Sequence, residues 1–424
     1  MKTNYFVFYK SNNRNILDIL TSISVFFLIL GFVVFLHERI FIIAVQAFFL
    51  IVMTIRLFFV KFKVNSFQTW SFLFFVFSIS SSIWANTSSV AVTTSISFLQ
   101  VAAVGNFLVL FADNETKLNY IKKIFIFSTL ILIVRLLATS PIDTFLSMRF
   151  GAISGTEDLF NPNEVGRILV FSSLLTISLI NKRSHLSLVI CLLSVFAFFL
   201  IFTGSRSSIL IYLLMILWLI SKVLVKKKLI LISLPIIVLL IFSFYFFFTK
   251  IPIVYSVIGN RIESFMGLLS GDTVDSSTIS RLNLLKNGIL FFAEKPLLGY
   301  GIGNYIELVS IGLYSHNNYL ELLVGGGGVG LIIYYSLYLS LFSHMKKQRK
   351  MTDYSIVLFL IFSLLYFDLI SVSYYSEISS LILTIVYAYA IMPRDFVYIR
   401  YTNSGLIRSN VMYVNNNQIN GGSI

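Results

Sequence analysis

The sequence predicts an all-α membrane protein of about twelve transmembrane helices, and three features lead to this prediction. The chain has 424 residues, of which 57% are hydrophobic and 12% are charged, whereas a soluble domain is typically about 25% charged. It contains 43 Phe residues. Apolar runs recur along the chain, and each approaches the roughly 20 residues that a helix needs to cross a bilayer. Water is therefore excluded as the main solvent.

Twelve apolar runs are expected to form these helices, and together they make residues 1–400 a single transmembrane domain. The first run, 16–36, is long enough to span a bilayer, so it is expected to be retained rather than cleaved as a signal peptide. The remaining helices are expected at residues 40–60, 66–85, 90–111, 121–139, 164–180, 185–203, 206–225, 229–249, 316–342, 353–371 and 374–393. The Asn- and Gly-rich tail, 401–424, is predicted to be disordered.

The positive charges predict how the helices are oriented. With the N-terminus in the cytoplasm, 21 Lys and Arg residues fall on inner segments and 8 fall on outer segments. Cytoplasmic loops of membrane proteins carry such an excess, so both termini and the tail are predicted to be cytoplasmic. The same distribution explains the net charge of +14 without a nucleic-acid partner.

The largest non-membrane segment is residues 250–315, which this orientation places outside the cytoplasm. Ser276-Ser277-Thr278 is a cap signal for a helix at about 279–293, in which Leu282, Leu285 and Ile289 recur at helical spacing. We expect an amphipathic helix that lies on the outer membrane surface, packs on the bundle, or does both. The inner segments are short, so no cytoplasmic domain driven by ATP or a nucleotide sugar is expected.

Three charged or titratable side chains on the outer side suit chemistry on a phosphate. Arg206 lies in a Gly- and Ser-rich turn between two helices, Arg281 opens the loop helix, and His316 opens the tenth span. An arginine presents a planar fork of donors that matches phosphate, and a histidine can accept a proton near neutral pH. Taken singly, each also has a simpler interpretation as a headgroup anchor, a surface charge or a helix-end residue.

Other features are less specific. Cys191 is the single cysteine, which excludes an intrachain disulfide, and no His, Asp or Glu cluster has metal-ligand spacing. No metal or cofactor is therefore predicted. The glycines at 325–328 and Gly330 allow close helix packing or a bend in the tenth span. Asp368 and Glu377 flank the last outer turn, where they either end helices or help to bind an acceptor sugar.

These motifs, in this order, resemble the O-antigen ligase/O-antigen polymerase superfamily of bacterial polytopic membrane proteins. The resemblance covers the turn around residue 206 and the block from about 276 to 333, and the first 150 or so residues match only in their number of spans. More loosely, Asn161-Pro162-Asn163 looks like the asparagine-bearing turn of the family. The matching segments are Thr203-Gly-Ser-Arg206, Ser280-Arg281, Pro296-Leu-Leu-Gly-Tyr-Gly-Ile-Gly-Asn304 and His316-Asn-Asn-Tyr-Leu-Glu321.

The resemblance implies a metal-independent glycosyltransferase that works at the outer face of a bacterial inner or plasma membrane. The donor would be a glycan on undecaprenyl diphosphate, and the acceptor would be a sugar hydroxyl on another lipid-linked glycan. Arg206 and Arg281 would hold the diphosphate, and His316 would take the proton of the acceptor hydroxyl. The residues expected to bind substrate are then Arg206, Arg281, Arg167, Asn317 and Lys286.

Three functions remain open at this point. The first is a polymerase of O-antigen, capsule or exopolysaccharide repeat units, the second is a ligase that moves O-antigen to the lipid A core of lipopolysaccharide, and the third is a lipid-linked-glycan flippase. We favour the polymerase because the Phe-, Ile-, Asn-, Lys- and Tyr-rich composition is typical of sugar-cluster genes. A flippase predicts ionisable residues spread through many spans. The expected partners are the lipid-linked oligosaccharide, membrane lipids, a chain-length regulator and a flippase.

Overall fold

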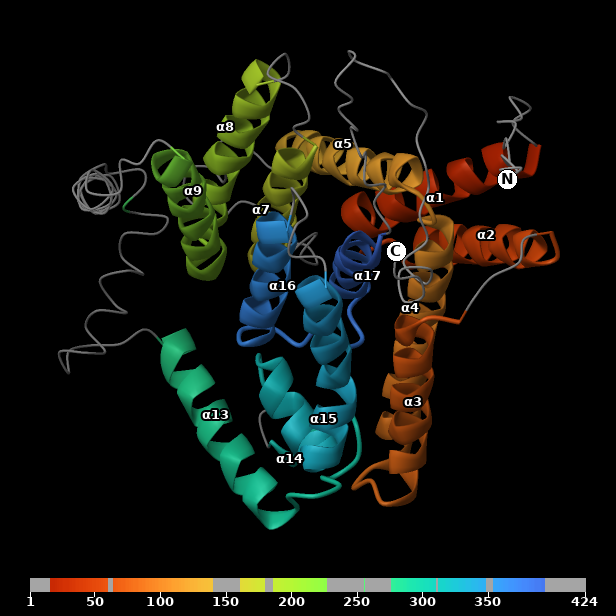
Figure 1. Ribbon diagram of the computed structural model, residues 1–424. Coiled ribbons are helices and arrows are strands. Elements are labelled where there is room, and N and C mark those ends of the chain that lie inside the picture. Colours follow the sequence, from red (N-terminus) through yellow and green to blue (C-terminus); the bar gives the residue numbers. More distant parts are fainter. Residues whose placement is uncertain are drawn as a thin grey trace, which may run out of the picture.

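The computed structural model describes residues 16–59, 64–139, 161–179, 186–226, 255, 276–309, 312–347 and 354–392. Within these ranges the chain forms helices and no strand, and the helices are labelled as in Figure 1. Their bounds are α1 Ile16–Val34, α2 Arg39–Leu57, α3 Ser66–Ser80, α4 Ser88–Phe111, α5 Glu115–Thr139, α7 Pro162–Ser178, α8 Leu186–Thr203, α9 Arg206–Lys226, α13 Ser276–Glu294, α14 Tyr305–Leu308, α15 Asn318–Lys347, α16 Tyr354–Asp368 and α17 Glu377–Ile391.

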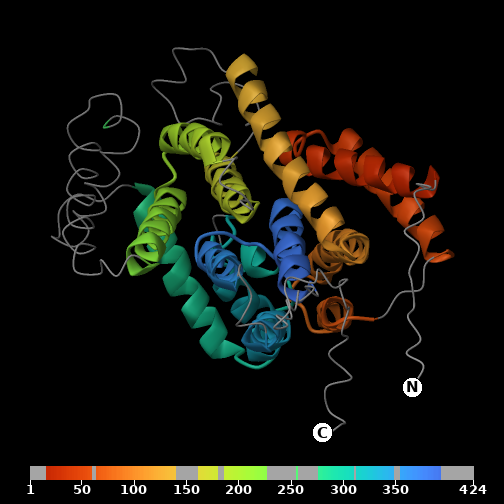
Figure 2. The ribbon, with the colours of Figure 1, turned by 45° about the horizontal axis from the view of Figure 1, so that its top comes forward.

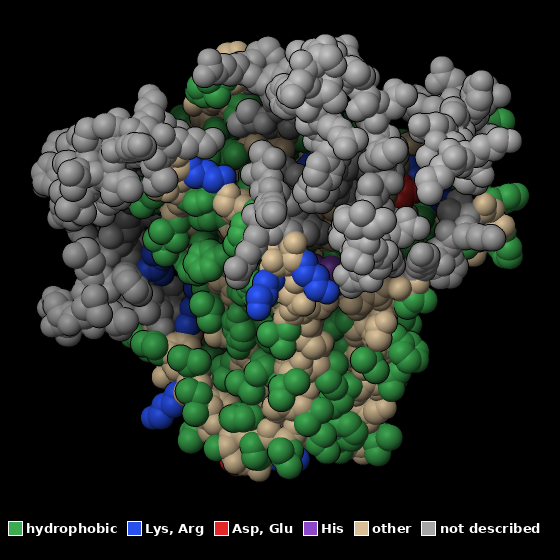
Figure 3. Space-filling view, in the orientation of Figure 1, with side chains coloured by type: hydrophobic (Ala, Val, Ile, Leu, Met, Phe, Trp, Pro, Cys, Tyr) green, Lys and Arg blue, Asp and Glu red, His purple; other side chains and the backbone are tan. Residues whose placement is uncertain are grey.

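A helix occupies each predicted apolar run that falls within the described ranges. The run at 229–249 and the tail 401–424 lie outside them. Five helices, α1, α2, α4, α8 and α15, are long and apolar enough to cross a membrane, and α16 and α17 are apolar but shorter. Hydrophobic side chains also cover much of the described face in Figure 3, which suits contact with lipid rather than water. The chain is therefore a polytopic all-α membrane protein.

Helix α17 lies at the centre of the bundle, surrounded by the other helices (Figure 2). It packs against α1, α4, α5, α15 and α16, and its residues from Leu381 to Ala390 are all buried. Ring contacts and hydrogen bonds fix its neighbours in turn. For example, the indole N–H of Trp70 on α3 donates a 2.7 Å hydrogen bond to the carbonyl oxygen of Tyr334 on α15.

Helix α15, which covers most of the span predicted at 316–342, folds back on itself. The rings of Tyr319 and Tyr335 stack with centroids 4.6 Å apart and planes at 5°. In a straight helix their 16 positions would separate them by about 24 Å. The break is at Gly327, which has φ 62° and ψ −165°. The glycine run therefore serves both expected purposes: the chain bends at Gly327, and Gly330 packs so closely on Phe77 that an added Cβ would lie 2.8 Å from that ring.

The turn at Gly327 is held by the segment that follows α13. The N–H of Gly328 donates to the carbonyl oxygen of Pro296 at 2.8 Å, and the N–H of Tyr300 donates to that of Val324 at 2.9 Å. A Cβ atom on Gly327 would collide with the carbonyl group of Leu297. Only glycine readily combines this positive φ with so close a backbone neighbour.

The fold-back creates a second, smaller core beside the main one. Helix α13 and the first half of α15 enclose a cluster of buried residues that is separate from the core of the bundle. The predicted loop helix at 279–293 is confirmed as α13, and its inner face packs on the bundle through this cluster. The buried members are Leu284, Tyr300, Tyr305, Val309, Leu320 and Val324.

Candidate functional site

The packing of α13 on the first half of α15 brings Arg281 and His316 to the same level. The closest approach is at Gly288, where an added Cβ would lie 2.5 Å from Leu320. Arg281, Leu284 and Gly288 share one face of α13 because they are spaced by three and four residues. The two segments run in the same direction (Figure 1). Arg281 lies two helical turns before Gly288 on α13, and His316 lies four residues before Leu320. The contact between Gly288 and Leu320 therefore brings Arg281 beside His316.

His316 has an unusual backbone conformation that its neighbours hold in place. Its φ is 54°, the one positive φ of a non-glycine residue in the described part of the chain, and such a conformation is uncommon outside glycine. The hydroxyl of Ser315 donates to the carbonyl oxygen of Asn317 at 2.8 Å. The buried carboxylate of Glu321 accepts the N–H of Ser315 at 3.1 Å. These bonds fix the turn from which the imidazole projects.

The imidazole of His316 is uncharged at neutral pH. Burial, together with the smaller effect of the positive charge of Arg281, lowers its pKa to about 4. The ring also lies against that of Tyr314, with centroids 4.1 Å apart and planes at 48°. A neutral ring in a fixed place can accept a proton from a bound hydroxyl group.

Arg167 lies near the start of α7, which Asn161 caps by accepting the N–H of Asn163 at 2.9 Å. The Arg167 side chain is buried. Its Nη1 donates to Ser379 Oγ at 2.7 Å, and its Nη2 lies 3.4 Å from Glu164 Oε1. Its Nε is buried without a hydrogen-bond partner. The guanidinium thus keeps one donor unused.

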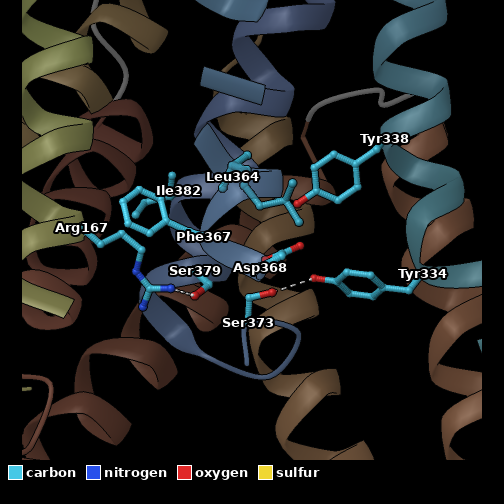
Figure 4. Close-up of a pocket in the computed structure, with 10 residues that line it drawn as sticks. Arg167, Tyr334, Tyr338, Leu364, Phe367, Asp368, Ser373, Ser379 and Ile382 are labelled. Carbon is cyan, nitrogen blue, oxygen red and sulfur yellow. Dashed lines mark hydrogen bonds between the residues drawn. The ribbon is translucent and has the colours of Figure 1, made fainter. Parts of the chain in front are cut away.

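A small cavity adjoins Arg167, inside the bundle (Figure 4). It has about 10 Å³ of space for the centre of a water molecule, which is roughly enough for one water. On the opposite wall lies the buried carboxylate of Asp368, which accepts the hydroxyl of Tyr335 at 2.9 Å. The polar lining residues are Arg167, Asp368, Ser373, Ser379, Tyr334 and Tyr338, and the apolar ones are Leu364, Phe367, Ile382 and Leu383.

Tyr314 connects the two halves of the site. Burial raises the pKa of its hydroxyl, the charge of Glu164 raises it further, and the charges of Arg281 and Arg167 lower it. The hydroxyl therefore lies within electrostatic range of groups on both α7 and α13. We refer to His316, Tyr314, Arg281, Arg167 and Glu164 as the polar cluster.

Arg206 begins α9 beside the helix that carries Arg167. A Cβ added to Gly166 would lie 2.7 Å from Ser208 Oγ and 3.1 Å from the Cβ of Ser205, so α7 and the start of α9 touch at this glycine. Arg206 itself is partly exposed. The structure thus packs the start of α9 against α7 one residue away from Arg167, and a contact of Arg206 with a diphosphate remains a prediction.

Two other predicted residues have different surroundings. Lys286 is exposed on α13, and no hydrogen bond or ion pair of the described residues joins it to the polar cluster. The side chain of Asn317 caps the first half of α15, because its Oδ1 accepts the N–H of Leu320 at 3.0 Å. A substrate contact for either residue stays a prediction.

Sequence reasoning gave no role to Glu164, Tyr314 or Ser379. None of them was quoted as a motif residue, and the contact of Ser379 with Arg167 joins positions 212 residues apart. The signal that the sequence did contain is general, since polar groups in or beside an apolar span are costly unless they are used. Among the described residues, no group of three His, Cys, Asp or Glu side chains could hold a metal ion.

Comparison with protein families adds an independent observation. A family model described as O-antigen ligase matches residues 188–335. This segment of the chain is similar to the O-antigen ligase family. The O-antigen ligase domain runs from α8 into the second half of α15, so it contains Arg206, Arg281 and His316, whereas Arg167 lies before it. Members of the family are glycosyltransferase-like ligases and polymerases. A search of curated proteins finds no match to the chain.

Proposed function

We propose that the protein is a polysaccharide repeat-unit polymerase. In this proposal it transfers an undecaprenyl-diphosphate-linked glycan to the sugar hydroxyl of another lipid-linked glycan. The observation that carries the proposal is the neutral imidazole of His316 beside the guanidinium of Arg281, inside the O-antigen ligase domain. A base next to a fixed cation suits the attack of a hydroxyl group on a carbon that bears a phosphate leaving group.

The reaction exchanges one bond at the anomeric carbon of the donor sugar. The acceptor hydroxyl oxygen forms a bond to this carbon while the bond to the diphosphate oxygen breaks, and the electron pair of that bond leaves with the diphosphate. The proton of the acceptor hydroxyl goes to the imidazole of His316. A positioned base of this kind contributes roughly 10²–10⁴-fold to a rate.

Arg281 and Arg206 stabilise the leaving group in this proposal. Charge builds up on the diphosphate as the bond breaks, and fixed cations in a partly dehydrated site stabilise such charge strongly. Because the energy is stored in the lipid-linked donor, the reaction needs no ATP, and in this proposal the two arginines stabilise the leaving group in place of a metal ion. A bound diphosphate beside Arg281 also offsets the charge that lowers the pKa of His316, which makes His316 a better base when substrate is present.

The proposal includes a topology. Twelve transmembrane helices place both termini in the cytoplasm and the polar cluster at the outer face of a bacterial inner or plasma membrane. The excess of Lys and Arg on the inner segments supports this orientation. At the outer face the enzyme meets lipid-linked units after a flippase has moved them, and a chain-length regulator is an expected partner.

The second candidate is an O-antigen ligase, because that is how the matching family is described. A ligase would use the same donor and the same polar cluster, but it would pass a finished polymer to the lipid A core. The two functions differ in the acceptor alone. A deletion strain separates them: single repeat units on undecaprenyl diphosphate, with no polymer, indicate a polymerase, whereas polymer stranded on undecaprenyl diphosphate beside bare core indicates a ligase.

The site is tested by complementing that strain with variants. Arg206→Ala, Arg281→Ala and His316→Ala are each expected to abolish polymer while the protein still reaches the membrane. Arg281→Lys is expected to restore little, since lysine lacks the planar fork of donors. Lys295→Ala is the control, because Lys295 is another cation of the outer segment, and its ammonium group lies over the Tyr300 ring instead. Full activity of all three alanine variants would show that the assigned site is wrong.

A further inference from the structure

The two arginines of the polar cluster have different electrostatic surroundings. Arg167 is buried, 3.4 Å from the carboxylate of Glu164, and shares a cavity with the carboxylate of Asp368. Arg281 is exposed, and no ion pair of the described residues includes it. The groups with which it interacts, His316 and Tyr314, are uncharged at neutral pH. The positive charge of Arg281 is therefore available to an anion, whereas that of Arg167 is already compensated.

From this difference we propose that Glu164 and Arg167 bind uncharged hydroxyl groups of the acceptor sugar, and that Arg281 serves the diphosphate. The inference rests on the function proposed above and assigns a side of the site to each substrate. The carboxylate of Glu164 lies 3.4 Å from the guanidinium of Arg167, so a diphosphate would meet repulsion from Glu164. A neutral sugar meets none.

The hydrogen bonds of Arg167 leave room for such a ligand. One bond is short, to Ser379 at 2.7 Å, but the contacts with Ser371 and Glu164 are both 3.4 Å long and therefore weak. The Nε donor is buried and unpaired, and an unpaired buried donor is energetically unfavourable. A sugar hydroxyl can accept from the guanidinium and donate to a carboxylate at the same time. The space beside Arg167, about one water in size, suits one hydroxyl group.

The subsite at Glu164 and Arg167 is also placed where a bound acceptor sugar could reach the proposed base, His316. The Glu164 side chain is 25% exposed, so a ligand can reach it from outside the buried cavity. The Ser373 N–H donates to the Oδ1 of Asn318 at 2.9 Å, which ties the cavity to the turn of His316. Tyr314, whose ring contacts that of His316, lies between the two arginines. An acceptor sugar held by Glu164 and Arg167 would thus place another of its hydroxyls near the imidazole.

The test measures the binding of the donor lipid and the use of the acceptor separately, with the purified full-length protein. The donor probe is undecaprenyl diphosphate without a sugar, and its Kd is measured directly. The acceptor probe is the delipidated repeat-unit oligosaccharide from the deletion strain, and its KM is measured with the native lipid-linked unit as donor. Glu164→Gln and Arg167→Lys are expected to raise the acceptor KM by about 10–100-fold, as for the loss of hydrogen bonds to charged groups. Their Kd for undecaprenyl diphosphate is expected to change by less than about 3-fold.

Two variants serve as comparisons. Arg281→Gln is expected to weaken undecaprenyl diphosphate binding by at least about 10-fold. Glu307→Gln removes an exposed carboxylate on α14 and is expected to change neither constant. The inference is overturned if the Glu164 and Arg167 variants weaken the diphosphate as much as Arg281→Gln does, or if they leave the acceptor KM unchanged. If Arg281→Gln itself binds undecaprenyl diphosphate normally, the proposed function fails instead.

Discussion

The side-chain amide of Asn318 donates a 3.1 Å hydrogen bond to the hydroxyl of Tyr335, although 17 positions of one helical stretch separate them. The Oδ1 atom of Asn318 accepts the backbone N–H groups of Ser373 and Tyr374 at 2.9 and 3.2 Å. One side chain thus joins both halves of α15 to the turn before α17. The fold-back and the polar cluster are therefore parts of the same arrangement.

The first prediction concerns the turn of this fold-back. Gly327→Ala is expected to lower the stability of the protein by about 1–3 kcal/mol, because its backbone conformation is strained for any other residue and its Cβ would strike Leu297. Gly328→Ala is the matched control, since a Cβ there meets only the Pro296 carbonyl oxygen at 3.5 Å. The measurement is the thermal unfolding midpoint of the two variants in detergent. Equal midpoints would contradict the fold-back at Gly327.

The second prediction concerns the contact that sets the level of Arg281. Gly288→Ala is expected to push α13 away from Leu320 and to lower polymer formation, because a Cβ would lie 2.5 Å from that side chain. Leu320→Ala makes room for the methyl group, so the double variant is expected to recover part of the activity lost in Gly288→Ala. A double-mutant cycle on initial rates measures the coupling, for which about 0.5–3 kcal/mol is typical of residues in contact. Strictly additive effects would argue against this packing.

The third prediction concerns pH. Since His316 has a pKa lowered to about 4, its neutral form persists well below its ordinary value near 6.5, and kcat/KM is expected to fall only as the pH approaches 4–5. Arg281→Gln removes a positive charge and is expected to move this acid limb to higher pH. The measurement is the pH profile of the residual activity of this variant, compared with that of the unmodified protein. An acid limb at the same pH in both proteins would show that Arg281 does not act on His316.

The same shift has a consequence for stability. The pKa of His316 is lower in the folded protein than in the unfolded chain, so the unfolded chain binds more protons between about pH 6.5 and 4. The contribution of His316 to stability is therefore complete above pH 6.5 and is lost as the pH falls toward 4. His316→Asn is expected to reduce the acid sensitivity of the thermal midpoint, which is measured at pH 7 and pH 5. The partial exposure of the ring reduces the size of this effect.

The fourth prediction concerns Glu321, which we assign as a positioning residue. Its carboxylate accepts the N–H of Ser315 and so holds the turn of His316. Glu321→Gln keeps an acceptor oxygen and is expected to retain most activity, whereas Glu321→Leu is expected to lose about 10–100-fold in kcat, as expected when a buried partner of a hydrogen bond is removed. Binding of undecaprenyl diphosphate should be unchanged in both variants. A Leu variant as active as the Gln variant would exclude this role.

Local sequence was sufficient for the helices and for part of the site. A run of about 20 apolar residues has few alternatives to a helix in a membrane, which explains why the predicted runs and the observed helices agree within the described ranges. The motifs around Arg281 and His316 also identified them as candidates, and the structure brings them together. The prediction of the helices and the choice of Arg281 and His316 as candidates both depend on residues that are close together in the sequence.

The remaining features depend on contacts between distant segments, and the tertiary structure alone decided them. The glycine run allowed close helix packing or a bend, and the bend of α15 depends on hydrogen bonds with the segment at Pro296. The pairing of Arg167 with Glu164 is local, but the Ser379 and Asp368 groups that complete its surroundings are about 200 positions away. The sequence by itself thus determined which segments form apolar helices within the described ranges and which residues are candidates for chemistry. Packing determined which charges are compensated and which are free, because that depends on the groups that surround each side chain in space.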